Sequence, residues 1–302
     1  MDILVFGAGA TGSLIGGLLS VRHDVTLVGR GDHMEAIRSR GLRITGKTAR
    51  VVHPETATRI PPGAHPQLIV VSTKAYDTAA AMFPLKRFAA SAVFLTLQNG
   101  LDNPEIIGRT AKRVIAGTTS HGVTVLGLGE IRHAGIGDTV VGGWQGVEPE
   151  DVVRVRDVLE EAGFRTRISK DIRVDLWAKL VVNAAINPLA ALAGVPNGRL
   201  VRDRDLSRLL DEVGREALAV AAAEGVPLDR EDTLRRTRLV ARRTASNRAS
   251  MLKDLYHCRR TEIDAITGAI LRTAERHGLE APRNRTLYAL IRARETAAAE
   301  SA

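Results

Sequence analysis

The fold is decided by the stretch Ile3-Leu4-Val5-Phe6-Gly7-Ala8-Gly9-Ala10-Thr11-Gly12. Its first four residues form an apolar run, as expected of a strand that is buried on both faces of a sheet. The glycines follow at the G-x-G-x-x-G spacing, and residues 13–20 then have the apolar spacing of a helix. A strand, this loop and a helix, in that order, predict a dinucleotide-binding turn.

Each glycine of the loop has a physical role in this prediction. Gly7 allows the tight turn, Gly9 lets the backbone approach a pyrophosphate, and Gly12 lets the helix pack closely on the strand. The helix N-terminus presents N–H groups and the positive end of its dipole to the phosphates. The alternative interpretation is a glycine-rich turn with a structural role only. The predicted cofactor loop comprises Gly7, Ala8, Gly9, Ala10, Thr11 and Gly12.

The second predicted strand, residues 24–28, indicates which dinucleotide binds. NAD enzymes usually end this strand with a carboxylate that holds the ribose 2′-hydroxyl. Here the strand ends Val28-Gly29-Arg30, and the guanidinium of Arg30 suits a 2′-phosphate instead. The sequence therefore favours NADP over NAD, with a solvated loop arginine as the alternative.

Two further polar residues follow predicted strands. Lys74 comes just after the strand at residues 68–71, and Asn99 comes just after the strand at 93–97. Open α/β sheets bind ligands at the carboxyl ends of their strands, so both side chains are candidates for the site. Asn99-Gly100 is also an ordinary turn signal, and that interpretation stays open.

The pattern along the chain predicts two domains. Strand and helix patterns alternate to about residue 110, and further strands and one helix follow up to residue 168. Among them, the β-forming segments 130–133 and 139–141 in the glycine-rich region 127–143 predict hairpins. From about Lys170 the pattern is helical to the end, and this change of period marks the boundary. We expect an α/β protein with a Rossmann-type dinucleotide-binding domain at residues 1–170 and an all-α domain at 171–302. Residues 296–302 are expected to fray.

Composition limits the class of protein. The 302 residues include 43 Lys and Arg against 34 Asp and Glu, for a net charge of +9, and the basic residues are densest between Arg230 and Arg260. A nucleic-acid surface would have this charge, but Tyr256 is the only Phe, Trp or Tyr there on which a base could stack. We interpret the stretch as a solvated helix face and expect no nucleic-acid partner.

The sequence also predicts the location of the protein. The single cysteine, Cys258, excludes an internal disulfide and a cysteine-based metal site, and we expect no metal. No uninterrupted run of 18 apolar residues and no charged leader are present, so neither a membrane span nor a signal peptide is expected. Together these features predict a cytoplasmic protein.

A second informative stretch lies at residues 176–193, which are almost wholly apolar. The exceptions Lys179, Asn183 and Asn187 are spaced i, i+4, i+8, so on a helix they form one polar stripe. Burying an ammonium and two amides without partners would cost several kcal/mol each. The stripe therefore faces a polar cleft or, alternatively, is satisfied by other protein groups. Pro188 is expected to end or kink this helix near Asn187.

A third group of polar residues lies at 247–264. Asn247 and Ser250 are i, i+3 neighbours, and on an unbroken helix Glu262 would fall within about 60° of Asn247 around the axis. Taken alone, this group also fits ordinary capping or surface positions.

Together these residues resemble the ketopantoate reductase (2-dehydropantoate 2-reductase) family over essentially the whole chain. The glycine loop is shared by many dehydrogenases, whereas the later motifs are more specific. The resemblance rests on residues 7–12, Lys74, 98–100, 117–121, 176–180 with Asn183 and 187–189, 196–198, 250–254 and 260–264.

The resemblance implies reduction of the keto group of 2-dehydropantoate by NADPH, in pantothenate and coenzyme A biosynthesis. It implies that Lys179 is the general acid, that Glu262 supports the reaction beside the cofactor, and that Asn99 lies where cofactor and substrate meet. It also implies that Arg30 and Lys74 hold the 2′-phosphate end of the cofactor. Asn183, Asn187 and Ser250 are implied to hold the substrate, with Asn197 and Asn247 as further candidates, and we include Val123 among the cofactor-binding candidates.

Two other functions stay open at this stage. One is an NADP-dependent reductase of a different 2-oxo acid, since fold does not fix substrate. The other is a non-catalytic NADP-binding sensor or a nucleic-acid-binding module. We expect a monomer or a homodimer whose partner is a small-molecule 2-oxo acid.

Overall fold

The computed structural model describes residues 1–300 of the chain, and its side chains as far as residue 297. The chain folds into two compact units. The first comprises Met1–Gln98 and Asn103–Asp175, and the second comprises Asn99–Asp102 and the chain from Leu176 onward. The first is an α/β unit and the second is helical, so the predicted fold class is confirmed.

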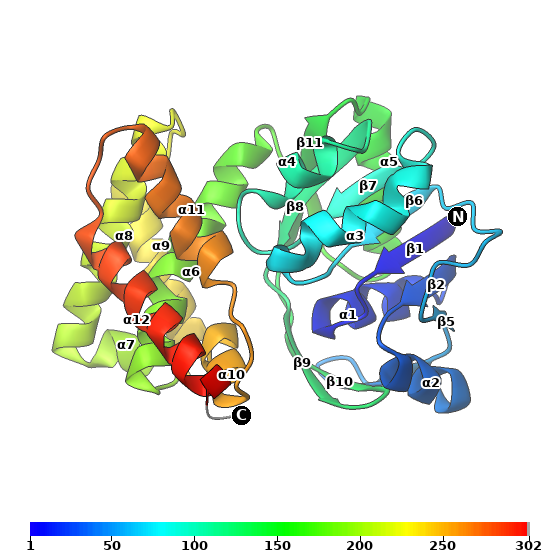
Figure 1. Ribbon diagram of the computed structural model, residues 1–302, viewed down its shortest axis with the longest axis horizontal. Coiled ribbons are helices and arrows are strands. Elements are labelled where there is room, and N and C mark those ends of the chain that lie inside the picture. The colour runs from blue at the N-terminus through cyan, green and yellow to red at the C-terminus, as the bar shows by residue number, and fades with distance from the viewer. Residues whose placement is uncertain (301–302) are drawn as a thin grey trace. The chain divides into compact units, whose positions relative to one another are not determined.

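The first unit is built on an eight-stranded sheet (Figure 1). Its order is β12-β11-β8-β7-β6-β1-β2-β5, and all neighbours are parallel except β11 and β8. The strands are β1 (Asp2–Phe6), β2 (Asp24–Val28), β5 (Glu55–Ala57), β6 (Leu68–Val71), β7 (Val93–Thr96), β8 (Arg113–Thr119), β11 (Thr139–Gln145) and β12 (Thr166–Ile168). The helices are α1 (Ala10–Leu19), α2 (Gly31–Arg40), α3 (Thr78–Leu85), α4 (Asn103–Gly108) and α5 (Pro149–Glu161), with single 3₁₀ turns at Ala75–Asp77 and Lys86–Phe88.

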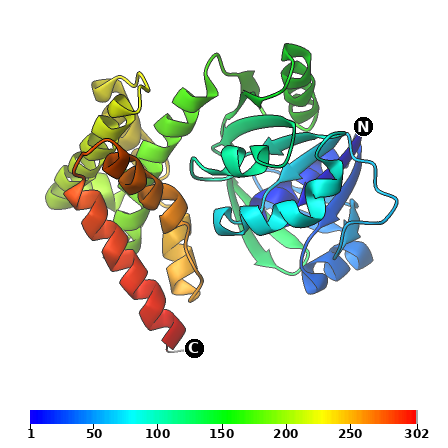
Figure 2. The same ribbon diagram turned by 45° about the horizontal axis from the view of Figure 1, so that its top comes forward.

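The two faces of this sheet carry separate apolar cores, because successive side chains of a strand point to opposite faces. Ile3 and Val5 of β1 pack in one core with residues of α1, α2 and α5. Leu4 packs in the other core with residues of α3 and α4, which cover that face in Figure 2. Burial on both faces explains why β1, β6 and β7 are continuous apolar runs.

A second, four-stranded sheet has the order β4-β3-β10-β9. It contains β3 (Leu42–Gly46), β4 (Arg50–Val52), β9 (Gly122–Gly127) and β10 (Glu130–Gly135). The sequence analysis predicted hairpins in this region, and β9 and β10 do form one. The predicted strand at residues 139–141 instead pairs with β8 in the large sheet, and β3, β4 and β5 were missed because they are short and partly polar.

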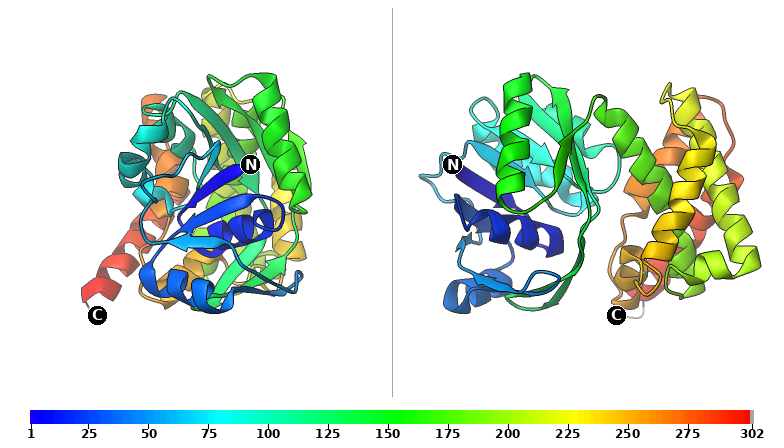
Figure 3. Two further views of the ribbon diagram at one scale, coloured as in Figure 1. Left: turned by 90° about the vertical axis from the view of Figure 1, so that its right-hand side faces the viewer. Right: turned by 180° about the vertical axis from the view of Figure 1, so that it is seen from behind.

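The second unit consists of helices, shown from other sides in Figures 2 and 3. They are α6 (Ile172–Ala193, whose first residues belong to the first unit), α7 (Arg199–Arg202), α8 (Arg204–Ala223), α9 (Arg230–Arg243), α10 (Ser250–Tyr256), α11 (Ile263–Arg276) and α12 (Pro282–Glu300). Residues of α6, α7 and α8 form a shared apolar core with Ala241 of α9 and Leu287 of α12.

Helix α6 does not end at Pro188, as the sequence analysis allowed, but continues to Ala193. By length and composition alone α6 could cross a membrane, although most of it is buried inside the protein, as in a core helix. The predicted fraying of residues 296–302 is wrong for the part described, because α12 extends to Glu300, and residues 301–302 lie outside the described residues.

The fit of the glycine loop generates a test of stability. A Cβ on Gly12 would overlap the Gly7 carbonyl oxygen and the Ser72 hydroxyl, whereas a Cβ on Gly9 would meet no atom within 4 Å. We expect Gly12→Ala to lower the free energy of unfolding by about 1–3 kcal/mol, the usual cost of overpacking. Gly9→Ala should change it by less than about 0.5 kcal/mol, as at uncrowded positions. Urea denaturation of both variants measures the difference, and equal stabilities would contradict the close approach at Gly12.

Candidate active site

Three predicted phosphate-binding segments meet at one edge of the large sheet. The glycine loop follows β1, Arg30 follows β2, and Lys74 follows β6. These strands are neighbours in the order β6-β1-β2 and are parallel, so their carboxyl ends lie at the same edge. This is the edge at which open α/β sheets bind ligands.

The backbone of the loop has the form that a dinucleotide needs. Gly7 has a φ of +106°, a conformation that side chains disfavour, and a Cβ there would strike the backbone of Ser72 and Thr73. Gly9 is the N-cap of α1 and faces open space, and no side chain caps the helix. The first N–H groups of α1 are therefore available to an anion such as a pyrophosphate.

Ser72 is a supporting residue that the sequence analysis did not assign. Its hydroxyl donates to the carbonyl oxygen of Gly7 at 2.9 Å, and it is one of the groups that a Cβ on Gly12 would strike. It ties the glycine loop to the neighbouring strand β6. The sequence could have indicated this role of Ser72, because it directly follows an apolar strand and lies two residues before Lys74.

The remaining cofactor candidates differ in position. Arg30 is exposed and is the N-cap of α2, while Lys74 is half-buried just before the 3₁₀ turn at Ala75–Asp77. Val123 lies on β9 of the small sheet, which packs against α1, and its side chain contacts the first apolar core. Val123 thus neighbours the helix that follows the glycine loop.

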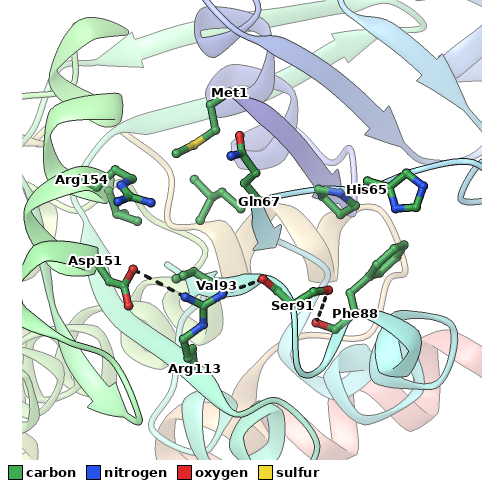
Figure 4. Close-up of a pocket in the computed structure, with 12 residues that line it drawn as sticks. Met1, His65, Gln67, Phe88, Ser91, Val93, Arg113, Asp151 and Arg154 are labelled. Atoms are coloured by element: carbon green, nitrogen blue, oxygen red, sulfur yellow. Dashed lines mark hydrogen bonds and ion pairs between the residues drawn. The ribbon is translucent and has the colours of Figure 1, made fainter.

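A cavity of about 320 Å³ lies at the opposite edge of the large sheet, at the amino ends of β6, β7 and β8 (Figure 4). Gln67 and Val93 line it at the beginnings of β6 and β7, and Arg113, at the beginning of β8, pairs with Asp151 across it. None of the predicted site residues lines this cavity. It is therefore distinct from the predicted dinucleotide site.

In the helical unit, α6 carries the polar stripe that the sequence predicted. Lys179 and Asn183 are half-buried, and Asn187 is only 8% exposed. In the described part of the chain, the side chains of these three residues make no hydrogen bond. Lys179 does interact with the Glu262 carboxylate, so both interpretations of the stripe, a polar cleft and satisfaction by other protein groups, stay open.

Lys179 interacts electrostatically with Glu262, the residue just before α11. Burial lowers the pKa of Lys179 from 10.5 to about 8, and the Glu262 carboxylate opposes part of that shift. The Asn99 amide donates to Glu262 Oε2 at 3.0 Å, so these three residues are brought together. They come from three separate parts of the sequence.

The position of Glu262 is fixed by its neighbours. Thr261 is buried, its N–H donates to Glu295 of α12 at 2.7 Å, and its hydroxyl accepts the N–H of Ile263. Asp264 accepts from Tyr288 and Arg260. The chain on both sides of Glu262, at the beginning of α11, is thereby attached to α12.

The third group of predicted residues is arranged differently from the sequence expectation. Asn247 and Glu262 do not share an unbroken helix, because α9 ends at Arg243 and α10 and α11 are separate. The loop at residues 244–249 is held instead by hydrogen bonds with another segment. The Asn197 N–H donates to the backbone carbonyl oxygen of Asn247, and the Gly198 N–H donates to that of Ala245.

The side chains of this group are held to different extents. The Asn197 amide donates to Thr244 at 2.9 Å, which gives Asn197 a structural role in joining two loops, while its Oδ1 atom is buried without a partner. Ser250 is exposed at the first residue of α10, and Asn247 is exposed just before it. In the described part of the chain, no group of three or more His, Cys, Asp or Glu side chains is placed to hold a metal ion.

A Rossmann-type unit with an open phosphate loop, and a helical unit with a half-buried lysine beside a carboxylate, define a dinucleotide-dependent oxidoreductase. The chain belongs to the ketopantoate reductase PanE/ApbA family. The family model matches residues 3–146, and the model of the family's C-terminal domain matches residues 171–295.

Comparisons with individual proteins support the same family. The chain is 39% identical to the 2-dehydropantoate 2-reductase of Pyrococcus horikoshii over 98% of both chains, and 39% identical to that of Halobacterium salinarum over 97% of this chain and 98% of the relative. A PanE/ApbA family ketopantoate reductase from Ralstonia eutropha JMP134 has a solved structure with 32% identity, a TM-score of 0.89 and 99% coverage of both chains. A D-mandelate dehydrogenase structure shares the fold at 24% identity, with a TM-score of 0.94 over 99% of both chains.

The interaction between Lys179 and Glu262 can be tested by titration. Glu262→Gln removes the charge that favours the ammonium form but keeps an oxygen for Asn99, so we expect the pKa of Lys179 to fall below about 8. Nuclear magnetic resonance of ¹³C-labelled lysine measures the pKa, with Lys179→Arg identifying the signal. Glu275→Gln, at an exposed position of the same helix, is the matched control. An unchanged pKa in Glu262→Gln would contradict the interaction.

Proposed function

We propose that this protein catalyses the NADPH-dependent reduction of 2-dehydropantoate to pantoate, in pantothenate and coenzyme A biosynthesis. The observation that carries the proposal is the cluster of Lys179, Glu262 and Asn99 in a chain of this family. A proton donor with a pKa near neutrality beside a carboxylate is what reduction of a ketone requires.

The first unit fits the dinucleotide. The open space at Gly9 and the uncapped N-terminus of α1 would hold the pyrophosphate. Arg30 and Lys74, at the same sheet edge, would hold the 2′-phosphate, with Val123 as a further contact. We propose the division already expected from the sequence: residues 1–170 bind NADP, and residues 171–302 bind the substrate.

NADPH, when bound, supplies the hydride that reduces the keto carbon. As negative charge develops on the carbonyl oxygen, the Lys179 ammonium stabilises it and then donates a proton to it. Burial lowers the pKa of Lys179 to about 8, so the ammonium form is retained at neutral pH while its proton becomes easier to give up. Glu262 favours the charged form of Lys179, and Asn99 holds Glu262 in place.

The substrate would be held by amides and a hydroxyl of the helical unit. Asn183 and Asn187 follow Lys179 along one stripe of α6, so their amides are placed to bind polar groups of the same molecule. Ser250 is proposed to bind the carboxylate of the substrate, with Asn247 beside it in the chain. Asn197 is a weaker candidate because its amide already donates to Thr244.

We further propose that the protein acts in the cytoplasm as a monomer or homodimer, without nucleic-acid or membrane partners. Part of the basic excess on α9 is neutralised within the helical unit, since Arg238 pairs with Asp211 and Arg235 with Asp232. This pairing supports a solvated helix face rather than a phosphate-binding surface.

The proposed reaction is tested by following NADPH oxidation with 2-dehydropantoate, 2-oxoisovalerate and pyruvate. We expect turnover with 2-dehydropantoate far above that with the other acids, and a rate constant that falls as pH rises through about 8, where Lys179 loses its proton. Lys179→Ala should lower kcat by about 10²–10⁴ with little change in NADPH affinity. The exposed Lys112→Ala is the control.

Two results would separate the parts of this proposal. Tight NADPH binding without turnover of 2-dehydropantoate would support NADPH as the cofactor and contradict 2-dehydropantoate as the substrate. A near-normal kcat in Lys179→Ala would contradict the assignment of Lys179 as the proton donor.

Recognition of the 2′-phosphate is tested by Arg30→Ala. Loss of the guanidinium should raise KM for NADPH much more than KM for NADH, because only NADPH carries the phosphate. Steady-state kinetics with both nucleotides measure the ratio, and exposed Arg22→Ala is the matched control. An equal rise for both nucleotides would contradict this role of Arg30.

A further inference from the structure

A buried histidine of the first unit lies close to the glycine loop without belonging to it. His33 is in the first turn of α2, three residues after Arg30, and is 7% exposed. Its Nδ1 atom accepts the N–H of Gly129, in the turn between β9 and β10, at 3.0 Å. Its Nε2 atom lies 3.2 Å from the hydroxyl oxygen of Ser13, a fully buried residue of α1.

The hydrogen bond from Gly129 decides the protonation of the ring. Because Nδ1 accepts a backbone N–H, the proton of the neutral imidazole is on Nε2. Burial lowers the pKa of His33, which favours this neutral form. His33 Nε2–H therefore donates to Ser13 Oγ, and the hydroxyl proton of Ser13 is left for another acceptor.

That acceptor is the carbonyl oxygen of Ala8 in the glycine loop, 3.2 Å from Ser13 Oγ. The result is a directed chain of hydrogen bonds from Gly129 through His33 and Ser13 to Ala8. Were the ring proton on Nδ1, Ser13 would donate to His33 and release the Ala8 carbonyl. A carbonyl oxygen free to turn toward a phosphate would repel it, since both are acceptors with negative charge.

We propose that His33 is a positioning residue for dinucleotide binding, which acts through Ser13 to hold the Ala8 carbonyl inside the protein and the phosphate-binding loop in its open form. This inference rests on the proposed function, in which that loop binds the pyrophosphate of NADPH. It assigns a role to a residue of α2 that contacts neither the cofactor nor the substrate. Arg30 is proposed to bind the 2′-phosphate, which only NADPH carries. His33 supports the loop for the pyrophosphate, which NADPH and NADH share.

The test is fluorescence titration of the purified full-length protein with NADPH and NADH. We expect His33→Ala to raise Kd by about 10-fold, in the range for a buried polar group left without its partner. The factor should be the same for both nucleotides, and kcat at saturating NADPH should stay near its original value. Arg30→Ala, by contrast, changes the ratio of the two Kd values.

Two substitutions separate the ring nitrogens of His33. In His33→Gln, the amide can place an N–H at about the reach of Nε2, so binding should be largely retained. In His33→Asn, the shorter side chain can serve Gly129 but cannot reach Ser13, so binding should weaken as in His33→Ala. Ser13→Ala should match His33→Ala, and the double variant should be no weaker than either single variant, because both break one chain.

A variant of the same helix controls for loss of stability. Ile37 is a core residue of α2 that contributes an apolar side chain and no side-chain hydrogen bond, so Ile37→Ala destabilises the unit without breaking the chain. Weakened binding in Ile37→Ala, at a Tm matched to that of His33→Ala, would overturn the inference. So would normal binding in His33→Ala, or a change in the ratio of Kd values. Failure of the unaltered protein to bind NADPH would instead overturn the proposed function and this inference with it.

Discussion

The first unit depends on a close approach at the glycine loop, where a Cβ on Gly12 would overlap the carbonyl oxygen of Gly7 and the hydroxyl of Ser72. No side chain larger than hydrogen fits there, so α1 can begin directly beside the end of β1 and next to β6. The uncapped helix N-terminus and the open face at Gly9 lie beside that approach, while the parallel pairing of β6, β1 and β2 brings Arg30 and Lys74 to the same sheet edge. The proposed phosphate site thus depends on backbone geometry, and the hydrogen bonds of Ser13 with His33 and with the Ala8 carbonyl connect its loop to α2.

The helical unit depends on a different constraint, the cost of an ammonium in an apolar helix. Burial of Lys179 lowers its pKa to about 8, and Glu262 offsets part of the cost. An apolar residue at position 179 would pack at lower cost, so the charged side chain fits the proposed role of Lys179 in proton transfer better than a role in stability. The residue before Glu262, Thr261, is held by Glu295 from a distant part of the chain.

Much of the fold was predictable because its signals are local. The strands predicted at residues 24–28 and 68–71 coincide with β2 and β6, and the helical period after residue 170 identifies the second unit's class. The errors arose where pairing is non-local. The strand at residues 139–141 joins β8 instead of β10, and β3 to β5 lack the length and apolar character that would reveal them. Helix α6 continues past Pro188, although proline at that position breaks an isolated helix.

The sequence by itself determined the residue types of both candidate sites: the glycine spacing, the arginine after β2, and the polar stripe of α6. These are read from neighbours a few positions apart, whose geometry is fixed by helix and strand periods. Only the tertiary structure brought Asn99 and Glu262 into one hydrogen bond, separated Asn247 from the helix of Glu262, and joined His33 to the glycine loop. Such contacts depend on how distant elements pack, and no local period encodes that packing.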